Sequence, residues 1–181
     1  GHAHGPRLGE CYTFCYEWAQ RKHDETKWIV LTGDPGCGKS RLGAIILRER
    51  YERFGQAGRW MSFVGYLDAL KQTFGVEGDH TAATIIKAAQ EAPLLIIDDL
   101  GVEKSTAWAQ ERGYALLAYR YDNKLETVVT TNVSIETLQP RLWDRLMHQR
   151  DDYSKLWDLS GLPSYRSRNV YLGTPTTRTT R

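Results

Sequence analysis

KWIVLTGDPGCGKS, residues 27–40, joins an apolar run that favours a β-strand to a turn containing three glycines. From Lys39 the pattern changes, because apolar residues recur at helical spacing as far as Gly55. The apolar side of this predicted helix contains Leu42, Ile45, Ile46 and Tyr51. A strand, a glycine-rich turn and a helix in this order are typical of a phosphate-binding loop.

The turn itself, GDPGCGKS at residues 33–40, fits the pattern G-x-x-x-x-G-K-S. Its glycines let backbone N–H groups converge on the β- and γ-phosphates at the positive end of the following helix. Lys39 would add a positive charge on those phosphates, and the Ser40 hydroxyl would be a ligand of Mg²⁺. An ordinary glycine-rich turn is the alternative, and the position between a strand and a helix argues against it. The predicted ATP-binding residues are Gly33, Asp34, Pro35, Gly36, Cys37, Gly38, Lys39, Ser40 and Arg41.

Two adjacent carboxylates, Asp98 and Asp99, follow the aliphatic run in LLIIDDLG, residues 94–101. A buried parallel strand delivers its last residues to the carboxyl edge of the sheet, where ligand sites of such folds form. We therefore predict that Asp98 is the carboxylate of the Mg²⁺ site. Asp99 is predicted to orient or deprotonate the attacking water, and its alternative role is to cap the loop that follows.

A third strand, ETVVTT at residues 126–131, is followed by Asn132. An uncharged amide at this position can bind the γ-phosphate or the attacking water without repelling the phosphate. An asparagine after a strand is by itself only a turn residue. The prediction that Asn132 senses the nucleotide therefore depends on the other two motifs.

The remaining sequence alternates between strand and helix patterns. We expect a helix at 8–23, a strand at 60–65, helices at 66–74 and 81–91, a strand at 94–98, a helix at 105–121, short helices around Ile135 and Trp143, and a strand near 155–160. Helical spacing makes Cys11 and Cys15 core residues rather than metal ligands. Uniformly apolar strands that alternate with helices predict an α/β fold, with a parallel sheet covered on both faces.

Composition limits the other possibilities. The chain has 181 residues, of which 41% are hydrophobic, enough for one sizeable core and one globular domain. No apolar run approaches the roughly 18 residues of a membrane span, so we expect no membrane association. The three cysteines favour a reducing compartment, and we expect a cytoplasmic protein. Residues 140–181 contain eight Lys and Arg against four Asp, a solvated basic surface or a set of arginines that face phosphates.

In this order the motifs resemble those of the AAA+ ATPases, and in detail those of the DnaC/DnaI helicase loaders and the related transposition helper IstB. The resemblance rests on GDPGCGKS, LLIIDDLG, TTNVS, RLWDRL and SYRSR. It implies a P-loop NTPase fold of three αβα layers, with a five-stranded, mostly parallel sheet and a lid domain that is reduced or absent. The expected organisation is a flexible N-terminus over residues 1–8, an AAA+ domain over 9–173 and a disordered basic tail over 174–181.

The resemblance also assigns arginines. Arg145, in RLWDRL, would be the arginine finger that reaches the nucleotide of a neighbouring subunit, supported by Arg141 one helical turn earlier. Arg166, in SYRSR, would be the sensor 2 arginine of its own subunit. An arginine finger contributes roughly 10³ to 10⁵ in rate. For each arginine a surface salt bridge is the alternative.

Loaders of this type bind single-stranded DNA through a polar residue and an aromatic residue shortly after the acidic strand. GVEKSTAW supplies Thr106 and Trp108 at the matching places, and Lys71, in LKQTFG, is a further candidate. A stacking aromatic beside a group that binds phosphate suits single strands, because every base has a π-face. Trp108 fits a core position equally well.

The sequence therefore favours the ATP-binding and ATP-hydrolysing AAA+ core of a replicative DNA helicase loader, which assembles through its ATP site and binds single-stranded DNA. The loaders bind their helicase through an N-terminal domain that this sequence does not contain. Two departures matter: Asp99 stands where many AAA+ enzymes have glutamate, which predicts slow turnover, and Cys37 stands where Thr or Ser is common. Cys37 is either a tolerated small residue or a redox switch.

An IstB-like, transposase-assisting ATPase that acts on duplex DNA is the main alternative to a helicase loader. A small-molecule kinase and a nucleotide-dependent binding module without turnover are further ones.

Overall fold

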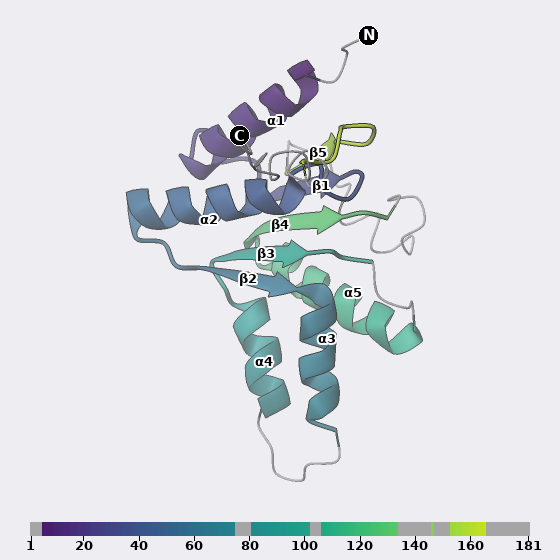
Figure 1. The fold of residues 1–181 in the computed structure, drawn as a ribbon. Helices are drawn as coiled ribbons and strands as arrows, with labels where there is room; N and C mark the ends of the chain where they lie inside the picture. Colours follow the sequence, from purple (N-terminus) through teal and green to yellow (C-terminus); the bar gives the residue numbers. More distant parts are fainter. Residues whose placement is uncertain (1–4, 75–80, 102–105, 134–145, 147–152, 166–181) are drawn as a thin grey trace, which may run out of the picture.

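A computed structural model describes residues 5–74, 81–101, 106–133, 146 and 153–165 (Figure 1). Its strands form one sheet in the order β2-β3-β4-β1-β5, and every neighbouring pair is parallel. The strands are β1 Trp28–Thr32, β2 Gly58–Ser62, β3 Leu94–Asp98, β4 Glu126–Thr131 and β5 Ser154–Asp158. The predicted α/β class and the five-stranded sheet are confirmed.

Helices cover both faces of the sheet. They are α1 Gly5–Ala19, α2 Lys39–Phe54, α3 Phe63–Gln72, α4 Thr81–Gln90 and α5 Ala107–Asp122. In Figure 1, α1 and α2 lie on one face, whereas α3, α4 and α5 lie on the other. This arrangement confirms the predicted three-layer sandwich. None of the helices in the described ranges is long and apolar enough to cross a membrane.

The apolar side chains of the strands contribute to two separate cores, because successive side chains of a strand point to opposite faces of the sheet. Trp28 and Val30 of β1 pack in the core beneath α3, α4 and α5. Ile29 and Leu31 of the same strand pack in the core beneath α1 and α2. Each aliphatic side chain that is fully buried in this way contributes about 1.5–3 kcal/mol. This explains why the strands read as continuous apolar runs instead of alternating ones.

Two sequence predictions for local structure were wrong. The strand expected at 60–65 ends at Ser62, because the Ser62 hydroxyl accepts a hydrogen bond from Gly65 N and caps α3. Phe63 is buried in the first turn of that helix, where an apolar residue cannot be distinguished from a strand residue by periodicity alone. In α2, Tyr51 is 67% exposed. It lies five residues after Ile46, which places it about 140° around the helix axis.

The cysteines of α1 are core residues, as predicted. The helix begins at Gly5 and ends at Ala19, and both Cys11 and Cys15 are buried beneath α2 with Trp18. A hydrogen bond with Cys11, together with burial, raises the pKa of the Cys15 thiol. The Cys15 thiol therefore stays protonated, and both cysteine side chains pack in the core as small groups. The short helices expected around Ile135 and Trp143 fall outside the described residues.

A buried arginine connects α5 to the strands. Arg120 is fully buried, and its guanidinium donates to the carbonyl oxygens of Ala89, Ala92 and Glu126 at 2.6–2.9 Å. Its Nε donates to Thr127 Oγ1 at 2.9 Å. Burial lowers the pKa of Arg120 to about 10, so the side chain remains charged at neutral pH. These bonds join the end of α4, the start of β4 and the last turn of α5.

Candidate functional site

The glycine-rich turn curls between β1 and α2 in the way that the sequence pattern predicts. Gly36 has a φ of 85°, in the left-handed region that favours glycine. A Cβ on Gly36 would collide with the side chain of Ser164, and a Cβ on Gly33 would collide with the backbone of Leu159. Glycine is therefore needed at both positions, for conformation and for the close approach of another segment.

Lys39 lies inside this turn and is only 4% exposed. Its Nζ donates to Gly33 O at 2.7 Å and to Asp34 O at 2.9 Å. The same nitrogen lies 3.7 Å from Cys37 Sγ. The loop thus holds a buried ammonium group beside the first turn of α2, where the helix dipole is also positive. Two sources of positive potential meet at this point, which suits a polyanion.

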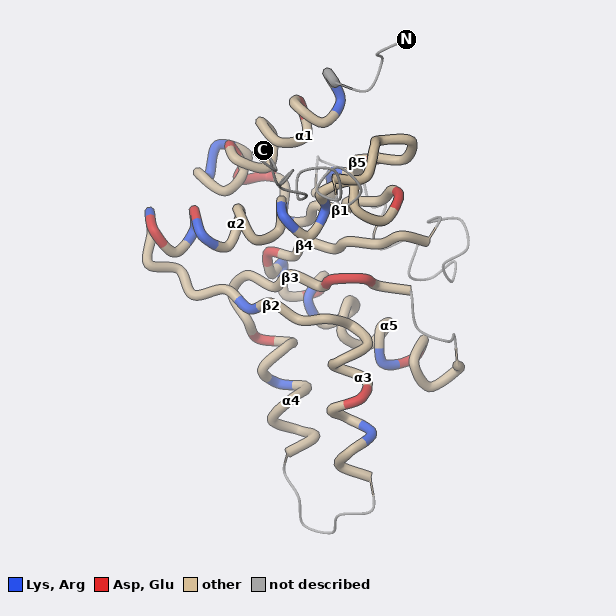
Figure 2. Tube along the Cα trace, in the orientation of Figure 1, with Lys and Arg blue, Asp and Glu red and all other residues tan. Residues whose placement is uncertain are grey.

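The serine of the loop meets the acid of the strand, although 58 residues separate them in sequence. Ser40 Oγ donates to Asp98 Oδ1 at 2.9 Å, at the carboxyl end of β3. Figure 2 shows the acidic pair at this end of β3. A hydroxyl and a carboxylate are hard oxygen ligands of the kind that Mg²⁺ prefers. The two residues predicted to hold the metal are adjacent, and their donor atoms fit that ion.

Sequence reasoning missed Thr130 of β4. Its Oγ1 donates to Asp98 Oδ1 at 2.6 Å and accepts from the backbone N of Asp99 at 3.0 Å. The signal was present in ETVVTT, since a polar residue near the end of a buried strand requires a hydrogen-bond partner. Its partners became evident only when β4 was found beside β3.

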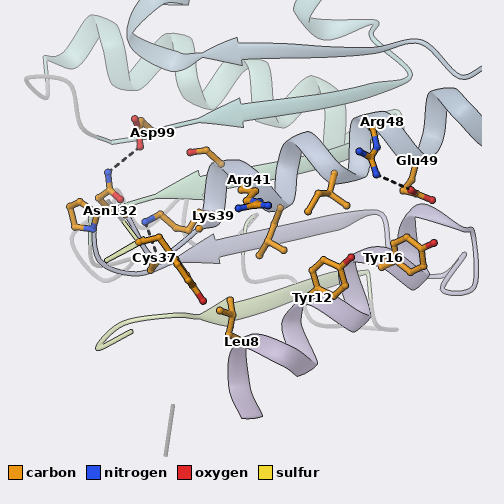
Figure 3. A pocket seen from close by; sticks show the side chains of 17 residues that line it. Leu8, Tyr12, Tyr16, Cys37, Lys39, Arg41, Arg48, Glu49, Asp99 and Asn132 are labelled. Atoms are coloured by element: carbon orange, nitrogen blue, oxygen red, sulfur yellow. Dashed lines mark hydrogen bonds and ion pairs between the residues drawn. The ribbon is translucent and has the colours of Figure 1, made fainter. Parts of the chain in front are cut away.

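Asp99 leaves the strand conformation with a φ of 57°, which is uncommon for a residue with a side chain. Asn132 Nδ2 donates to its Oδ1 at 3.0 Å. In Figure 3 the two side chains point toward one another above the loop that holds Lys39. The structure therefore brings together the side chain predicted to activate water and the amide predicted to sense the nucleotide.

A cavity of about 690 Å³ extends from this group of polar residues along the groove between α1 and α2. The loop with Asp99 and Asn132 lines one part of it, and α1 and α2 line the rest with Leu8, Tyr12 and Ile45 and with the charged Arg48 and Glu49. Arg41, which the sequence assigned to ATP binding, also lines it. Sequence reasoning did not assign any residue of α1 to the site, because the amphipathic pattern of α1 indicates only a packed helix.

The segment that follows β5 is hydrogen bonded to the loop. Gly161 N donates to Asp34 Oδ2 at 2.7 Å, although the two residues are 127 positions apart. Tyr165 N donates to Gly36 O at 2.9 Å. The Asp34 carboxylate, which the sequence assigned to the nucleotide, is therefore bonded to this segment. Hydrogen bonds from Ser160 hold the pKa of Asp158, at the end of β5, below its usual range.

The residues predicted to contact DNA form a second group, at the ends of α3 and α5. Lys71 Nζ lies 5.8 Å from the ring centroid of Trp108. Phe74, which sequence reasoning missed, is 63% exposed. Its ring lies edge-on to the Trp108 ring, with 5.5 Å between the two ring centroids. Trp108 also packs against the core, so it occupies both environments that its sequence position suggested. The Thr106 hydroxyl accepts from Ala109 N at 3.2 Å and caps α5.

The arginines assigned by resemblance lie outside the described residues. These are Arg141, Arg145 and Arg166, and their roles stay predictions.

Comparisons with known proteins agree on one family. A family model described as IstB-like ATP binding protein matches residues 18–152. The replicative helicase loader DnaC of Escherichia coli strain K12 is 27% identical over 140 residues, which make up 77% of this chain and 56% of that protein. The chain spans about half the length of the curated relatives it matches.

Solved structures share the fold of this chain. A crystal structure of the DnaC helicase loader has a TM-score of 0.69 and 26% identity, covering 83% of this chain and 88% of that one. The replication initiator DnaA, bound to AMPPCP and single-stranded DNA, has a TM-score of 0.66 and 17% identity, covering 87% of this chain and 46% of that one. The second likeness shows a shared fold alone.

Proposed function

The chain belongs to the family of IstB-like ATP binding proteins, and from that premise we propose that it binds ATP with Mg²⁺ and hydrolyses the γ-phosphate. Its similarity to DnaC supports an AAA+ domain of the helicase-loader type. The observation that carries the proposal is the convergence of Ser40, Asp98 and Asp99 at one sheet edge, beside the buried Lys39.

The cavity supports ATP as the ligand over inorganic phosphate. Its loop end carries the Lys39 ammonium and the positive end of α2, which suit a triphosphate. Along α1 and α2 it is lined by Leu8, Tyr12 and Ile45, which offer an apolar surface to a purine ring. A volume of about 690 Å³ lies within the usual range for sites of this kind.

Ser40 and Asp98 would hold the Mg²⁺ ion. When bound there, the ion would neutralise charge on the β- and γ-phosphates. Lys39 would contact the same phosphates from the loop side, in exchange for the backbone carbonyls that it now contacts. The protein groups therefore surround the phosphate chain with opposite charge before any reaction begins.

Asp99 would accept the proton of the attacking water. Asn132 holds the Asp99 carboxylate by its amide hydrogen, which leaves the second carboxylate oxygen to the water. Because aspartate is one methylene shorter than glutamate, it would reach that water through a second one, and turnover would be slow. Arg145 of a neighbouring subunit and Arg166 would stabilise the transition state, so that hydrolysis depends on assembly through the ATP site.

The second group of residues supports binding of single-stranded DNA. Phe74 and Trp108 offer two ring surfaces on which bases can stack, and Lys71 adds a positive charge for the backbone. The Thr106 hydroxyl lies at the start of α5, the helix that contains Trp108. Because these contacts involve π-faces and phosphates, binding would be independent of base sequence and sensitive to salt.

A helicase loader is the role that these features support best, with a hexameric replicative helicase as the partner. The family model, which takes its description from IstB, favours a second candidate, a transposase-assisting ATPase on duplex DNA. Two measurements distinguish them. A loader should prefer single-stranded to duplex DNA and should retain a helicase in a pull-down, whereas an IstB-like protein should prefer duplex and retain a transposase.

The proposal is tested by nucleotide binding and phosphate release from the wild-type chain and Lys39→Ala. Loss of charged hydrogen bonds typically costs about 1.5–3 kcal/mol, so the variant should bind ATP about 10- to 100-fold more weakly. Arg48→Ala, which removes an exposed arginine from the far part of the cavity, is the control and should keep most of the affinity. Equal ATP affinity in Lys39→Ala and wild type would contradict the proposed phosphate site. Binding without phosphate release would favour the nucleotide-dependent binding module.

A further inference from the structure

Thr130 joins the two acids of the site through a single atom. The residue is completely buried near the end of β4. Its Oγ1 donates to Asp98 Oδ1 at 2.6 Å and accepts from Asp99 N at 3.0 Å. A hydroxyl has one proton to donate and lone pairs to accept, so the two bonds use it in complementary directions. The orientation of this hydroxyl is therefore determined by both acids.

The bond to Asp98 restricts the carboxylate predicted to hold the metal. Oδ1 of Asp98 receives two hydroxyl donors, Ser40 at 2.9 Å and Thr130 at 2.6 Å. Ser40 comes from the phosphate loop, whereas Thr130 comes from the neighbouring strand of the sheet. Since Ser40 would itself contact the ion, Thr130 is the donor that can hold Asp98 independently of the nucleotide.

The bond to Asp99 stabilises an unusual backbone conformation. A left-handed residue that is not glycine persists only where its surroundings hold it. Here β4 supplies three hydrogen bonds to the turn: Asp99 N to Thr130 Oγ1, Leu100 N to Thr130 O at 2.9 Å, and Thr131 Oγ1 to Leu100 O at 2.7 Å. The direction of the Asp99 side chain therefore depends on β4.

We propose that Thr130 is a positioning residue that orients Asp98 toward the metal and Asp99 toward the attacking water. This inference rests on the proposed binding of Mg²⁺ and ATP at this site. It predicts that loss of the Thr130 hydroxyl weakens the metal-dependent part of ATP binding and leaves the metal-independent part, which the loop and Lys39 provide. Loss of an outer hydrogen bond to a metal ligand typically lowers metal affinity or activity by about 10- to 100-fold.

The test measures the affinity of a fluorescent ATP analogue in Mg²⁺ and in EDTA, for wild type, Thr130→Val and Thr130→Ser. Valine keeps the branched shape without the hydroxyl, and serine keeps the hydroxyl. Thr130→Val should match wild type in EDTA and should lose about 10- to 100-fold of the affinity that Mg²⁺ adds. Thr130→Ser should recover most of that gain.

Thr127→Val is the matched control, since it removes another buried hydroxyl of β4 that contacts Arg120 instead of the acids. It should lower the melting temperature and keep the gain from Mg²⁺. If Thr130→Val does not fold, Thr130→Ala replaces it in the comparison with Thr130→Ser.

The outcomes separate the two proposals. A folded Thr130→Val with the same gain from Mg²⁺ as wild type would overturn the role of Thr130 alone. A wild-type chain whose ATP affinity did not respond to Mg²⁺ would overturn the proposed metal site, and the role of Thr130 with it.

Discussion

The phosphate-loop end of the sheet and the aromatic group at α3 and α5 are built in different ways. At the sheet edge, polar side chains from α2, β3 and β4 are hydrogen bonded to one another, as Ser40, Asp98 and Thr130 illustrate. At the helix ends, Phe74 and Trp108 meet through ring contacts, and Phe74 is largely exposed. Functional side chains at the first place are hydrogen bonded to several partners, whereas the rings at the second place contact one another and the core.

This contrast predicts different responses to substitution. In a network where each group fixes the next, removing one member disturbs all of them. In the aromatic group, each ring contributes its own stacking surface, and losses of DNA affinity should be graded. Substitutions at the two places therefore test whether they are independent.

The largest effect is expected at Asp99. Asp99→Asn keeps the shape of the side chain and removes its capacity to accept a proton. Positioned general bases typically contribute about 10² to 10⁴ in rate, so phosphate release should fall by that factor while ATP affinity stays within a few-fold. Single-turnover phosphate release and equilibrium ATP binding measure the two effects. Unchanged turnover would leave Asp99 with the role of capping the loop.

A smaller effect is expected at the aromatic group. Trp108→Ala should weaken binding of single-stranded DNA by about 1–3 kcal/mol, because one stacking surface is lost. Fluorescence anisotropy at fixed salt measures this, and ATP affinity should not change. Phe54→Ala, which removes another exposed aromatic residue at the end of α2, is the control. If Trp108→Ala lowers only the melting temperature, the residue serves the core alone.

The smallest effect is expected at Asp34, whose carboxylate accepts from Gly161 N on the outer side of the loop. Asp34 is exposed, so the bond contributes little, about 0.5–1.5 kcal/mol. Asp34→Ala should lower the melting temperature by a few degrees and ATP affinity by about 2- to 5-fold. Asp34→Asn, which keeps an oxygen acceptor, should lose less. Equal losses in the two variants would show that charge matters more than the hydrogen bond.

Much of the fold was predictable from local patterns. Uniformly apolar strands indicated a sheet covered on both faces, and the spacing of Cys11 and Cys15 indicated a core helix, both of which the structure confirms. The boundary between β2 and α3 was not predictable, because the polar residue that ends the strand is also the cap of the helix. Tyr51 was misplaced because five residues do not return to the same side of a helix.

Local sequence patterns identify the residues whose partners lie nearby in the chain or follow from strand order. The glycine-rich turn, Lys39 and the acids after β3 belong to this class, since parallel strands must end at one edge. The other residues that meet them are evident only in the folded chain: Thr130 between the acids, α1 along the cavity, and Gly161 on Asp34. Thr130 and Asp98 lie 32 positions apart and Gly161 and Asp34 lie 127 positions apart, and a linear pattern does not show which residues meet over such separations.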